Sequence, residues 1–181
     1  NGMIAPLLKY SFDGVIWYQG ESNEGNAAQY GELLESMISD WREQFGDSEL
    51  PFYIVELASY LHSGRKGPEH GWNRVQAEQR RTAGKMRGTV LVPNSDLGEW
   101  NDIHPLNKKD LAATLLLGAR KLCYGEKVDA MGPVYREMKI DGDKIILYFD
   151  EARGGLKTSD GGKLKHFAIA GEDGKFVWAD A

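Results

Sequence analysis

The stretch Gly14-Val15-Ile16-Trp17-Tyr18-Gln19-Gly20-Glu21-Ser22-Asn23 decides the fold of this chain. Its first half is a continuous apolar and β-branched run bounded by glycines, the pattern of a strand that is covered on both faces. We therefore expect a central strand of a parallel sheet over residues 14–18. The polar second half predicts a loop that leads from this strand into a helix.

The rest of the first two thirds of the chain repeats this alternation of strand and helix. Apolar residues recur at i, i+3 and i+4 in the longest predicted helix, which we expect to stop near Gly46. Such alternation predicts an α/β fold with a parallel sheet between two helical layers, and with reactive groups in the loops at the carboxyl ends of the strands. The predicted order is helix 3–10, strand 14–18, helix 30–45, strand 51–57, helix 73–85, strand 89–92 and helix 107–124.

The last third of the chain has a different pattern. Short apolar or alternating runs are separated there by Asp-Gly and Gly-Gly pairs, which favour antiparallel strands joined by turns. We therefore assign residues 1–127 to the α/β domain and residues 128–181 to a small antiparallel β region.

The composition excludes several classes of function. The chain has 181 residues, and 22 Lys and Arg residues against 27 Asp and Glu residues give a net charge of −5, which argues against nucleic acid as the partner. No apolar run approaches the length of about 20 residues that a membrane span needs. The single cysteine, Cys123, excludes an intrachain disulfide. His62, His70 and His166 share no metal-ligand spacing with His104, so we expect neither a metal nor a cofactor.

Two predicted strand-to-helix loops contain the candidate chemistry. In the first, Gln19 follows the buried strand, and its amide with neighbouring backbone N–H groups could stabilise an oxyanion. The alternative is a simple connection in which Ser22 or Asn23 caps the helix.

The second loop, Asp96-Leu97-Gly98-Glu99-Trp100-Asn101-Asp102-Ile103-His104-Pro105, crowds acids around one imidazole. A histidine whose ring N–H is held by a carboxylate serves as a general base in nucleophilic catalysis, which favours His104 with Asp102. The alternative is structural, with Asp102 or Asn107 capping the next helix and His104 hydrogen-bonded in its surroundings.

These two motifs, together with Asn1-Gly2-Met3-Ile4-Ala5-Pro6-Leu7, resemble the sialate O-acetylesterases, a family of SGNH hydrolases. Gly132-Pro133 and Phe167-Ala168-Ile169-Ala170-Gly171 fit the β region that follows in that family. The resemblance implies a flavodoxin-like three-layer α/β fold and a metal-free serine esterase. Its expected substrates are glycans or small sugars that carry O-acetyl groups.

The resemblance also assigns roles to residues. It implies that His104 is the base, that Asp102 is its acidic partner and that Gln19 is an oxyanion donor, with Gly20 and Glu21 shaping the loop. We expect Gly20, Glu21, Asn23 and Trp100 to contact the substrate. Relatives are often exported, so a periplasmic or secreted location is expected, although no targeting segment is present in these residues.

The chain departs from the family pattern in two ways. The superfamily spacing Asp-x-x-His would place Asn101 at the acid position, so Glu99 or Asp96 remains an alternative to Asp102. The Gly-Gln-Ser-Asn block that carries the nucleophile in the family has no counterpart here. We therefore expect a carboxyl-terminal portion with an incomplete sheet, inactive by itself, that self-associates or pairs with the missing amino-terminal segment.

Two other functions fit the same residues. In the first, Ser22 is the nucleophile of a complete esterase, although Gly20-Glu21-Ser22-Asn23 lacks the second glycine of a nucleophile elbow. In the second, the chain is a non-catalytic carbohydrate-binding module that offers Trp17, Trp72 and Trp100 as platforms for sugars.

Overall fold

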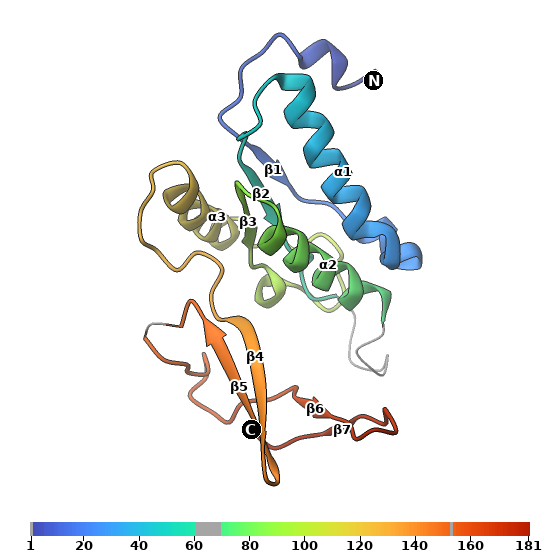
Figure 1. Ribbon diagram of the computed structural model, residues 1–181, viewed down its shortest axis with the longest axis vertical. Helices are drawn as coiled ribbons and strands as arrows, with labels where there is room; N and C mark the ends of the chain where they lie inside the picture. The colour runs from blue at the N-terminus through green and yellow to red at the C-terminus, as the bar shows by residue number, and fades with distance from the viewer. Residues whose placement is uncertain (1, 61–69, 153) are drawn as a thin grey trace. The chain divides into compact units, whose positions relative to one another are not determined.

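The structure is a computed structural model, and it describes residues 2–60, 70–152 and 154–181. Figure 1 shows the course of the chain and labels its helices and strands. The chain forms two compact units, residues 1–132 and residues 133–181. The sequence-based domain boundary lies at residue 128, and the units divide after Gly132.

A three-stranded parallel sheet forms the centre of the first unit, with the strands in the order β1-β2-β3. Every residue of β2 and β3 is buried, which explains why their sequences are continuous apolar runs rather than alternating ones. The strands are β1 (Val15–Trp17), β2 (Phe52–Val55) and β3 (Thr89–Val92).

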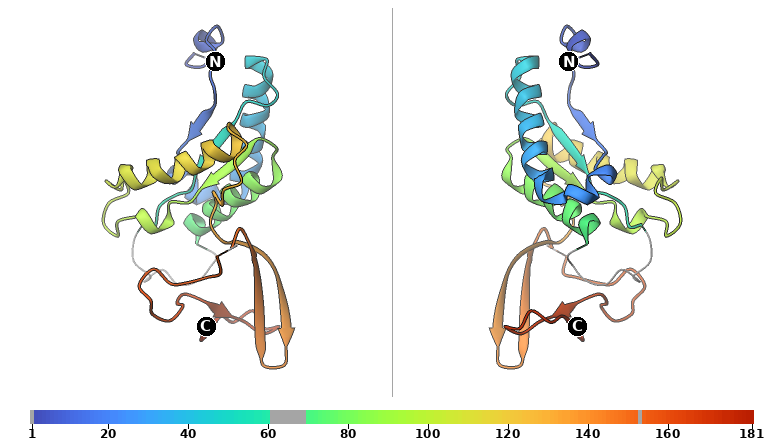
Figure 2. Two further views of the ribbon diagram at one scale, coloured as in Figure 1. Left: turned by 90° about the vertical axis from the view of Figure 1, so that its left-hand side faces the viewer. Right: turned by 90° about the vertical axis from the view of Figure 1, so that its right-hand side faces the viewer.

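Three helices cover the two faces of this sheet, and Figure 2 shows α1 and α2 on one face with α3 on the other. The α1 and α2 side encloses the larger core, in which Ile38, Phe52 and Val75 are fully buried. On the α3 side, Leu111 packs with residues of β2 and β3. The predicted three-layer α/β fold is confirmed. The helices are α1 (Ala27–Phe45), α2 (Gly71–Lys85) and α3 (Lys108–Leu122).

The amphipathic pattern of α1 places its apolar positions against the sheet. Tyr30, Leu34 and Ile38 are buried at the i, i+4, i+8 spacing that gives a helix one apolar face. Gly46 ends the helix in the left-handed conformation, with φ of 69°, and its N–H bonds to carbonyl groups of the last turn. The predicted stop near Gly46 is confirmed.

Strand β1 differs from its prediction as a central strand covered on both faces. It lies at the edge of the described sheet, and Ile16 is 59% exposed while Val15 and Trp17 pack on the α1 and α2 side. The reason is that α3 contacts β2 and β3, so no described helix covers Ile16.

The amino-terminal residues also differ from their prediction as a helix over residues 3–10. Only a short 3-10 helix, η1 (Ala5–Leu7), forms there, and none of its residues is buried. Met3 is 86% exposed, so the apolar spacing of this segment has no core to pack against. In proteins most helical stability comes from tertiary packing of an apolar face, which explains the difference.

The second unit consists of two antiparallel pairs, β4 with β5 and β6 with β7. Gly142, with φ of 61°, supplies the turn between β4 and β5. The predicted antiparallel strands are confirmed, although the last two are shorter than the sequence suggested. The strands are β4 (Val134–Asp141), β5 (Lys144–Asp150), β6 (Ala168–Ile169) and β7 (Val177–Trp178).

Candidate active site

The carboxyl edge of the parallel sheet places polar residues from three separate segments at one end of the fold. Gln19 follows β1, Glu56 follows β2 and Asn94 follows β3. Because parallel strands all end at the same edge, residues far apart in the sequence meet there. The two candidate loops of the sequence both start at this edge.

The first loop begins at Gly20, whose backbone takes a conformation that favours glycine. Its φ is 146°, and a Cβ added there would lie 2.9 Å from Cγ1 of Val75 on α2. The Asn23 N–H donates to the carbonyl of Gly20 over 2.9 Å, which starts the 3-10 helix η2 (Glu21–Asn26). The glycine therefore lets the loop turn while it packs directly against α2.

The Gln19 side chain is oriented by this turn. Its Nε2 donates to Oδ1 of Asn23 over 2.8 Å, and an amide NH₂ group carries a second hydrogen for another acceptor. The structure thus brings Gln19 and Asn23 together, as expected for a loop that presents a donor. Glu21 begins η2 beside them, and Ser22 is exposed.

Tyr30 and Gln79 hold the first loop in place through hydrogen bonds to its backbone. The Tyr30 hydroxyl donates to the Gln19 carbonyl over 2.9 Å and accepts from the Trp17 indole over 3.3 Å. Gln79, which is fully buried on α2, donates through Nε2 to the carbonyls of Gln19 and Val55. Burial raises the pKa of Tyr30, and its hydrogen bonds to Trp17 and Gln79 act in the opposite direction. Both residues are neutral groups that hold the loop.

A second connection ties the same loop to the start of α2. Nδ1 of His70 accepts from the Trp72 N–H over 3.3 Å, and Nε2 lies 3.0 Å from Oε1 of Glu24. Because Nδ1 accepts, the proton of the neutral ring lies on Nε2 and faces the carboxylate. Both nitrogens of His70 are therefore engaged in holding η2 against α2.

The second loop carries His104 with its side chain 87% exposed. Oδ1 of Asp102 accepts from the backbone N–H of His104 over 2.7 Å and lies 3.8 Å from Nδ1 of the ring. The second distance is too long for a hydrogen bond, as is common for catalytic hydrogen bonds before a substrate binds. The structure therefore brings the proposed base and acid together without joining them.

The other two acidic candidates are placed differently. Oε1 of Glu99 accepts from the backbone N–H of Leu106 over 3.0 Å, so this carboxylate braces the loop. Asp96 lies one turn earlier, in the 3-10 helix η3 (Ser95–Leu97). Of the three carboxylates, that of Asp102 lies within 4 Å of a ring nitrogen of His104.

A buried carboxylate forms an ion pair with a half-exposed arginine at the carboxyl edge of the sheet. The Glu56 carboxylate is 2% exposed and pairs with the Arg80 guanidinium, while its Oε2 accepts from the Asn94 N–H over 3.4 Å. Asn94 is itself 1% exposed, and its Nδ2 donates to the Glu56 carbonyl over 3.2 Å and to the Tyr18 hydroxyl over 3.0 Å. This network joins the ends of all three strands.

Two of the three tryptophans proposed as sugar platforms are not available for that role. Trp72 is 7% exposed and donates through its indole to the Ala58 carbonyl, and Trp17 packs edge-on against Trp41. The prediction is wrong for these two because the α1 and α2 core uses their aromatic area. Trp100 is 61% exposed and stays a candidate substrate contact.

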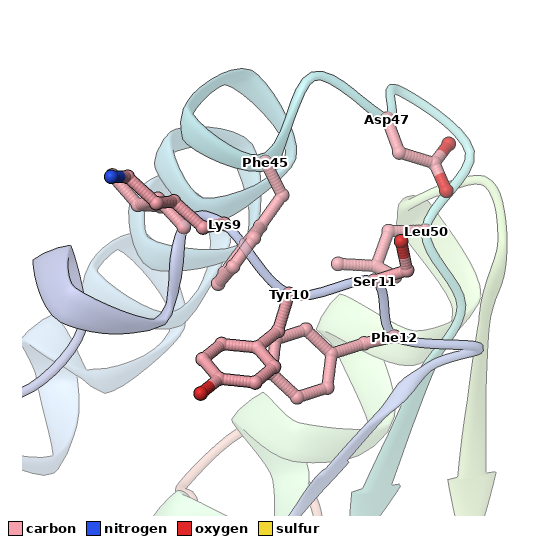
Figure 3. A pocket seen from close by; sticks show the side chains of 8 residues that line it. Lys9, Tyr10, Ser11, Phe12, Phe45, Asp47 and Leu50 are labelled. Carbon is pink, nitrogen blue, oxygen red and sulfur yellow. The ribbon is translucent and has the colours of Figure 1, made fainter.

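The cavity shown in Figure 3 lies at the opposite edge of the sheet. It has a volume of about 270 Å³, and Lys9, Tyr10 and Phe12 line it from the segment before β1. Phe45 and Leu50 complete it between the end of α1 and the start of β2. None of the candidate residues contributes to this cavity.

Neither a metal site nor a membrane helix appears in the residues that the structure describes. These residues contain no group of three or more His, Cys, Asp or Glu side chains arranged to hold a metal ion. None of the described helices is long and apolar enough to cross a membrane. His62, one of the histidines whose spacing argued against a metal site, lies outside the described residues.

Sequence reasoning missed the supporting residues Tyr30, Glu56, Gln79 and Asn94. A usable signal exists for two of them, because Glu56 and Asn94 are polar residues that directly follow buried strands. For Tyr30 and Gln79 no such signal exists. Each lies at a buried position of a helix, and the sequence pattern of the helix does not distinguish a residue that supports a loop from one that only fills the core.

Comparison with known proteins identifies the class to which this fold belongs, the carbohydrate acetylesterases. The structure aligns with a crystal structure of a carbohydrate acetylesterase from Xanthomonas citri with a TM-score of 0.91 and 39% sequence identity. The alignment covers 98% of this chain and 41% of that chain.

Sequence comparison leads to a particular family. Residues 4–120 match the family described as carbohydrate esterase, sialic acid-specific acetylesterase. Sialate O-acetylesterases from Homo sapiens and Mus musculus are each 35% identical to this chain over 81% of its length. The chain belongs to this sialic acid-specific acetylesterase family. It spans 31% of the human relative and 30% of the mouse relative, about a third of each.

Proposed function

We propose that this chain supplies the base and the oxyanion-binding loop of a serine esterase that removes O-acetyl groups from sialic acid or a related sugar. Family membership supports the reaction class, since the relatives are sialate O-acetylesterases. The observation that carries the proposal is the position of both candidate loops at one edge of the sheet, with Gln19 oriented by Asn23 and Asp102 beside His104.

In the proposed reaction a serine hydroxyl attacks the acetyl carbonyl while His104 takes the serine proton. Gln19 and backbone N–H groups of its loop stabilise the oxyanion of the tetrahedral intermediate. The intermediate collapses to an acetyl-serine, and His104 returns the proton to the departing sugar oxygen. Water, deprotonated by the same histidine, then releases acetate and restores the serine hydroxyl.

We further propose that the attacking serine comes from outside residues 1–181. The hydrogen bonds of the described residues include none between a serine hydroxyl and His104, and Ser22 lies in a turn that the Gly20 backbone and Asn23 build. The chain alone is then inactive, and the outer edge of β1, which pairs only with β2 among the described strands, is where the rest of the sheet would pair.

A serine-reactive fluorophosphonate tests this proposal. The full-length protein should form one adduct, which mass spectrometry should map to a serine outside residues 1–181. The His104→Ala variant should not form this adduct. An adduct on Ser22 would instead identify this chain as a complete esterase. If no serine reacts while O-acetylated sugar still binds, a carbohydrate-binding function that uses Trp100 gains support.

A further inference from the structure

The Tyr18 hydroxyl accepts a hydrogen bond from the buried side-chain amide of Asn94. Nδ2 of Asn94 donates to it over 3.0 Å and donates its other hydrogen to the Glu56 carbonyl over 3.2 Å. Because a carbonyl oxygen can only accept, the contact with Glu56 fixes which end of the amide faces Tyr18. The Tyr18 oxygen is therefore the acceptor in this hydrogen bond.

The Tyr18 proton must then point elsewhere. A tyrosine hydroxyl donates one hydrogen bond, and no described residue accepts one from Tyr18. The ring is half-buried and packs with residues of the α3 side, which fixes the position of the hydroxyl oxygen. Asn94 is 1% exposed and is bound to Glu56 at both backbone and side chain, which makes the support rigid.

Tyr18 lies on the same face of the sheet as the helix that follows His104. Neighbouring strand residues point to opposite faces, and Trp17 packs on the α1 and α2 side whereas Tyr18 packs on the α3 side. The Lys108 ammonium, four residues beyond His104, lies 4.9 Å from the centre of the Tyr18 ring. The Gln19 carbonyl is bound on the other side, by Tyr30 and Gln79.

This arrangement separates two parts of the substrate. A general base of this type returns its proton to the leaving oxygen, so the sugar lies on the side of the base, while the oxyanion faces the Gln19 loop. An unused donor on the α3 side of the sheet, where the segment after His104 lies, is therefore suited to the sugar rather than to the acetyl group.

From these contacts we infer that Tyr18 is a sugar-contacting residue, whose hydroxyl donates a hydrogen bond to an oxygen of the sugar, and that Asn94 is its positioning residue. This inference rests on the proposed esterase function. It predicts discrimination by the part of the substrate that leaves, not by the acetyl group.

The test compares the hydrolysis of two acetyl esters by the full-length protein and by its variants. One is O-acetylated N-acetylneuraminic acid, and the other is para-nitrophenyl acetate, which has the same acetyl group and no sugar. In Tyr18→Phe, the ratio of kcat/KM for the sugar ester to kcat/KM for the aryl ester should fall about threefold to tenfold, the effect of one lost hydrogen bond. Asn94→Ala should lower the ratio similarly, and the double variant should lose no more than Tyr18→Phe alone.

Tyr53→Phe is the matched control, because it removes a hydroxyl on the same face of the sheet that lies 3.0 Å from Cys123 instead of near Asn94. Its ratio should equal that of the unchanged protein. A ratio that stays constant in Tyr18→Phe overturns the inference, as does an equal loss of both activities. Thermal melting separates folding defects of Asn94→Ala from the Tyr18→Phe result.

Binding of free N-acetylneuraminic acid, followed by saturation-transfer NMR, tests the inference without catalysis. Affinity should fall in Tyr18→Phe and stay constant in Tyr53→Phe, even if the protein hydrolyses neither ester and the proposed function fails. Equal affinity of Tyr18→Phe and the unchanged protein, or no binding by any form, overturns the inference.

Discussion

The Lys108 ammonium lies 4.9 Å from the centre of the Tyr18 ring, which joins the start of α3 to the end of β1. Lys108 is the first residue of α3, where the helix dipole disfavours a positive charge. The aromatic face offsets part of this cost and holds the segment after His104 close to the segment that begins with Gln19. The two candidate loops of this acetylesterase family member are connected through this contact.

Replacement of His104 should abolish catalysis without affecting the fold. In the full-length protein, His104→Ala should lower kcat/KM for para-nitrophenyl acetate by about three orders of magnitude or more. The reason is that the proposed mechanism has no other group to take the serine proton. The melting temperature should hardly change, since the side chain is 87% exposed. His166→Ala, which removes a histidine of the second unit, is the control and should retain activity. Retained activity in His104→Ala would refute the assignment of the base.

The acid is tested by three matched amide substitutions. Asp102→Asn should lower kcat by at least about tenfold, because the His104 ring loses the carboxylate that orients it and stabilises its charged form. Asp96→Asn and Glu99→Gln should have smaller effects, since Glu99 bonds to the Leu106 backbone. A larger loss in either of these two variants would move the acid role to that residue.

Gly20 should tolerate no side chain. Gly20→Ala combines a φ of 146° with a close contact to Val75, so we expect a loss of about 1–3 kcal/mol in the free energy of unfolding. Urea unfolding of the chain measures this loss. Gly25→Ala, in the 3-10 helix η2 that follows Gly20, is the control, because a Cβ there would meet nothing within 4 Å. Equal stability of the two variants would contradict the conformation described for Gly20.

Gln79 should be among the most important polar residues of the core. Its Oε1 accepts from the Leu57 N–H, and its Nε2 donates to the carbonyls of Gln19 and Val55. Gln79→Ala leaves these backbone groups buried without partners, which should cost about 2–4 kcal/mol in the free energy of unfolding. Urea unfolding should show no comparable loss for Gln29→Ala, whose side chain is exposed on α1. A loss below 1 kcal/mol, roughly one ordinary hydrogen bond, would rule out this role.

The contact between α1 and α2 should weaken in acid. The hydrogen bond from Lys85 holds the pKa of Glu35 below its ordinary value, with a further contribution from Arg81. A carboxylate with a lowered pKa in the folded state stabilises the fold above its unfolded pKa, and this contribution is lost as the pH falls through the folded pKa. Unfolding curves of Glu35→Gln should therefore show lower stability than the unchanged chain at pH 7 and a smaller difference near pH 3. Glu32→Gln, on the exposed face of α1, is the control. A difference that does not shrink in acid would exclude this linkage.

The sequence alone determined the α/β class, the order of its main elements and the two loops that carry the candidate chemistry. Continuous apolar runs such as Phe52–Val55 and the regular spacing of Tyr30, Leu34 and Ile38 are local patterns, and the hydrophobic effect acts on them in the same way in any α/β protein. The motif around Gln19 and the motif around His104 could also be found in the sequence, because each is a continuous stretch of residues.

Only the tertiary structure decided which of these residues meet. The sequence shows neither that Asn94 reaches the Tyr18 hydroxyl, 76 positions away, nor that Gln79 binds the Gln19 carbonyl, 60 positions away. Local spacing also predicted a helix over residues 3–10 and a doubly covered first strand, and both were wrong because no described element packs against Met3 or Ile16. Burial depends on what the rest of the chain brings to a segment, and no local pattern contains that information.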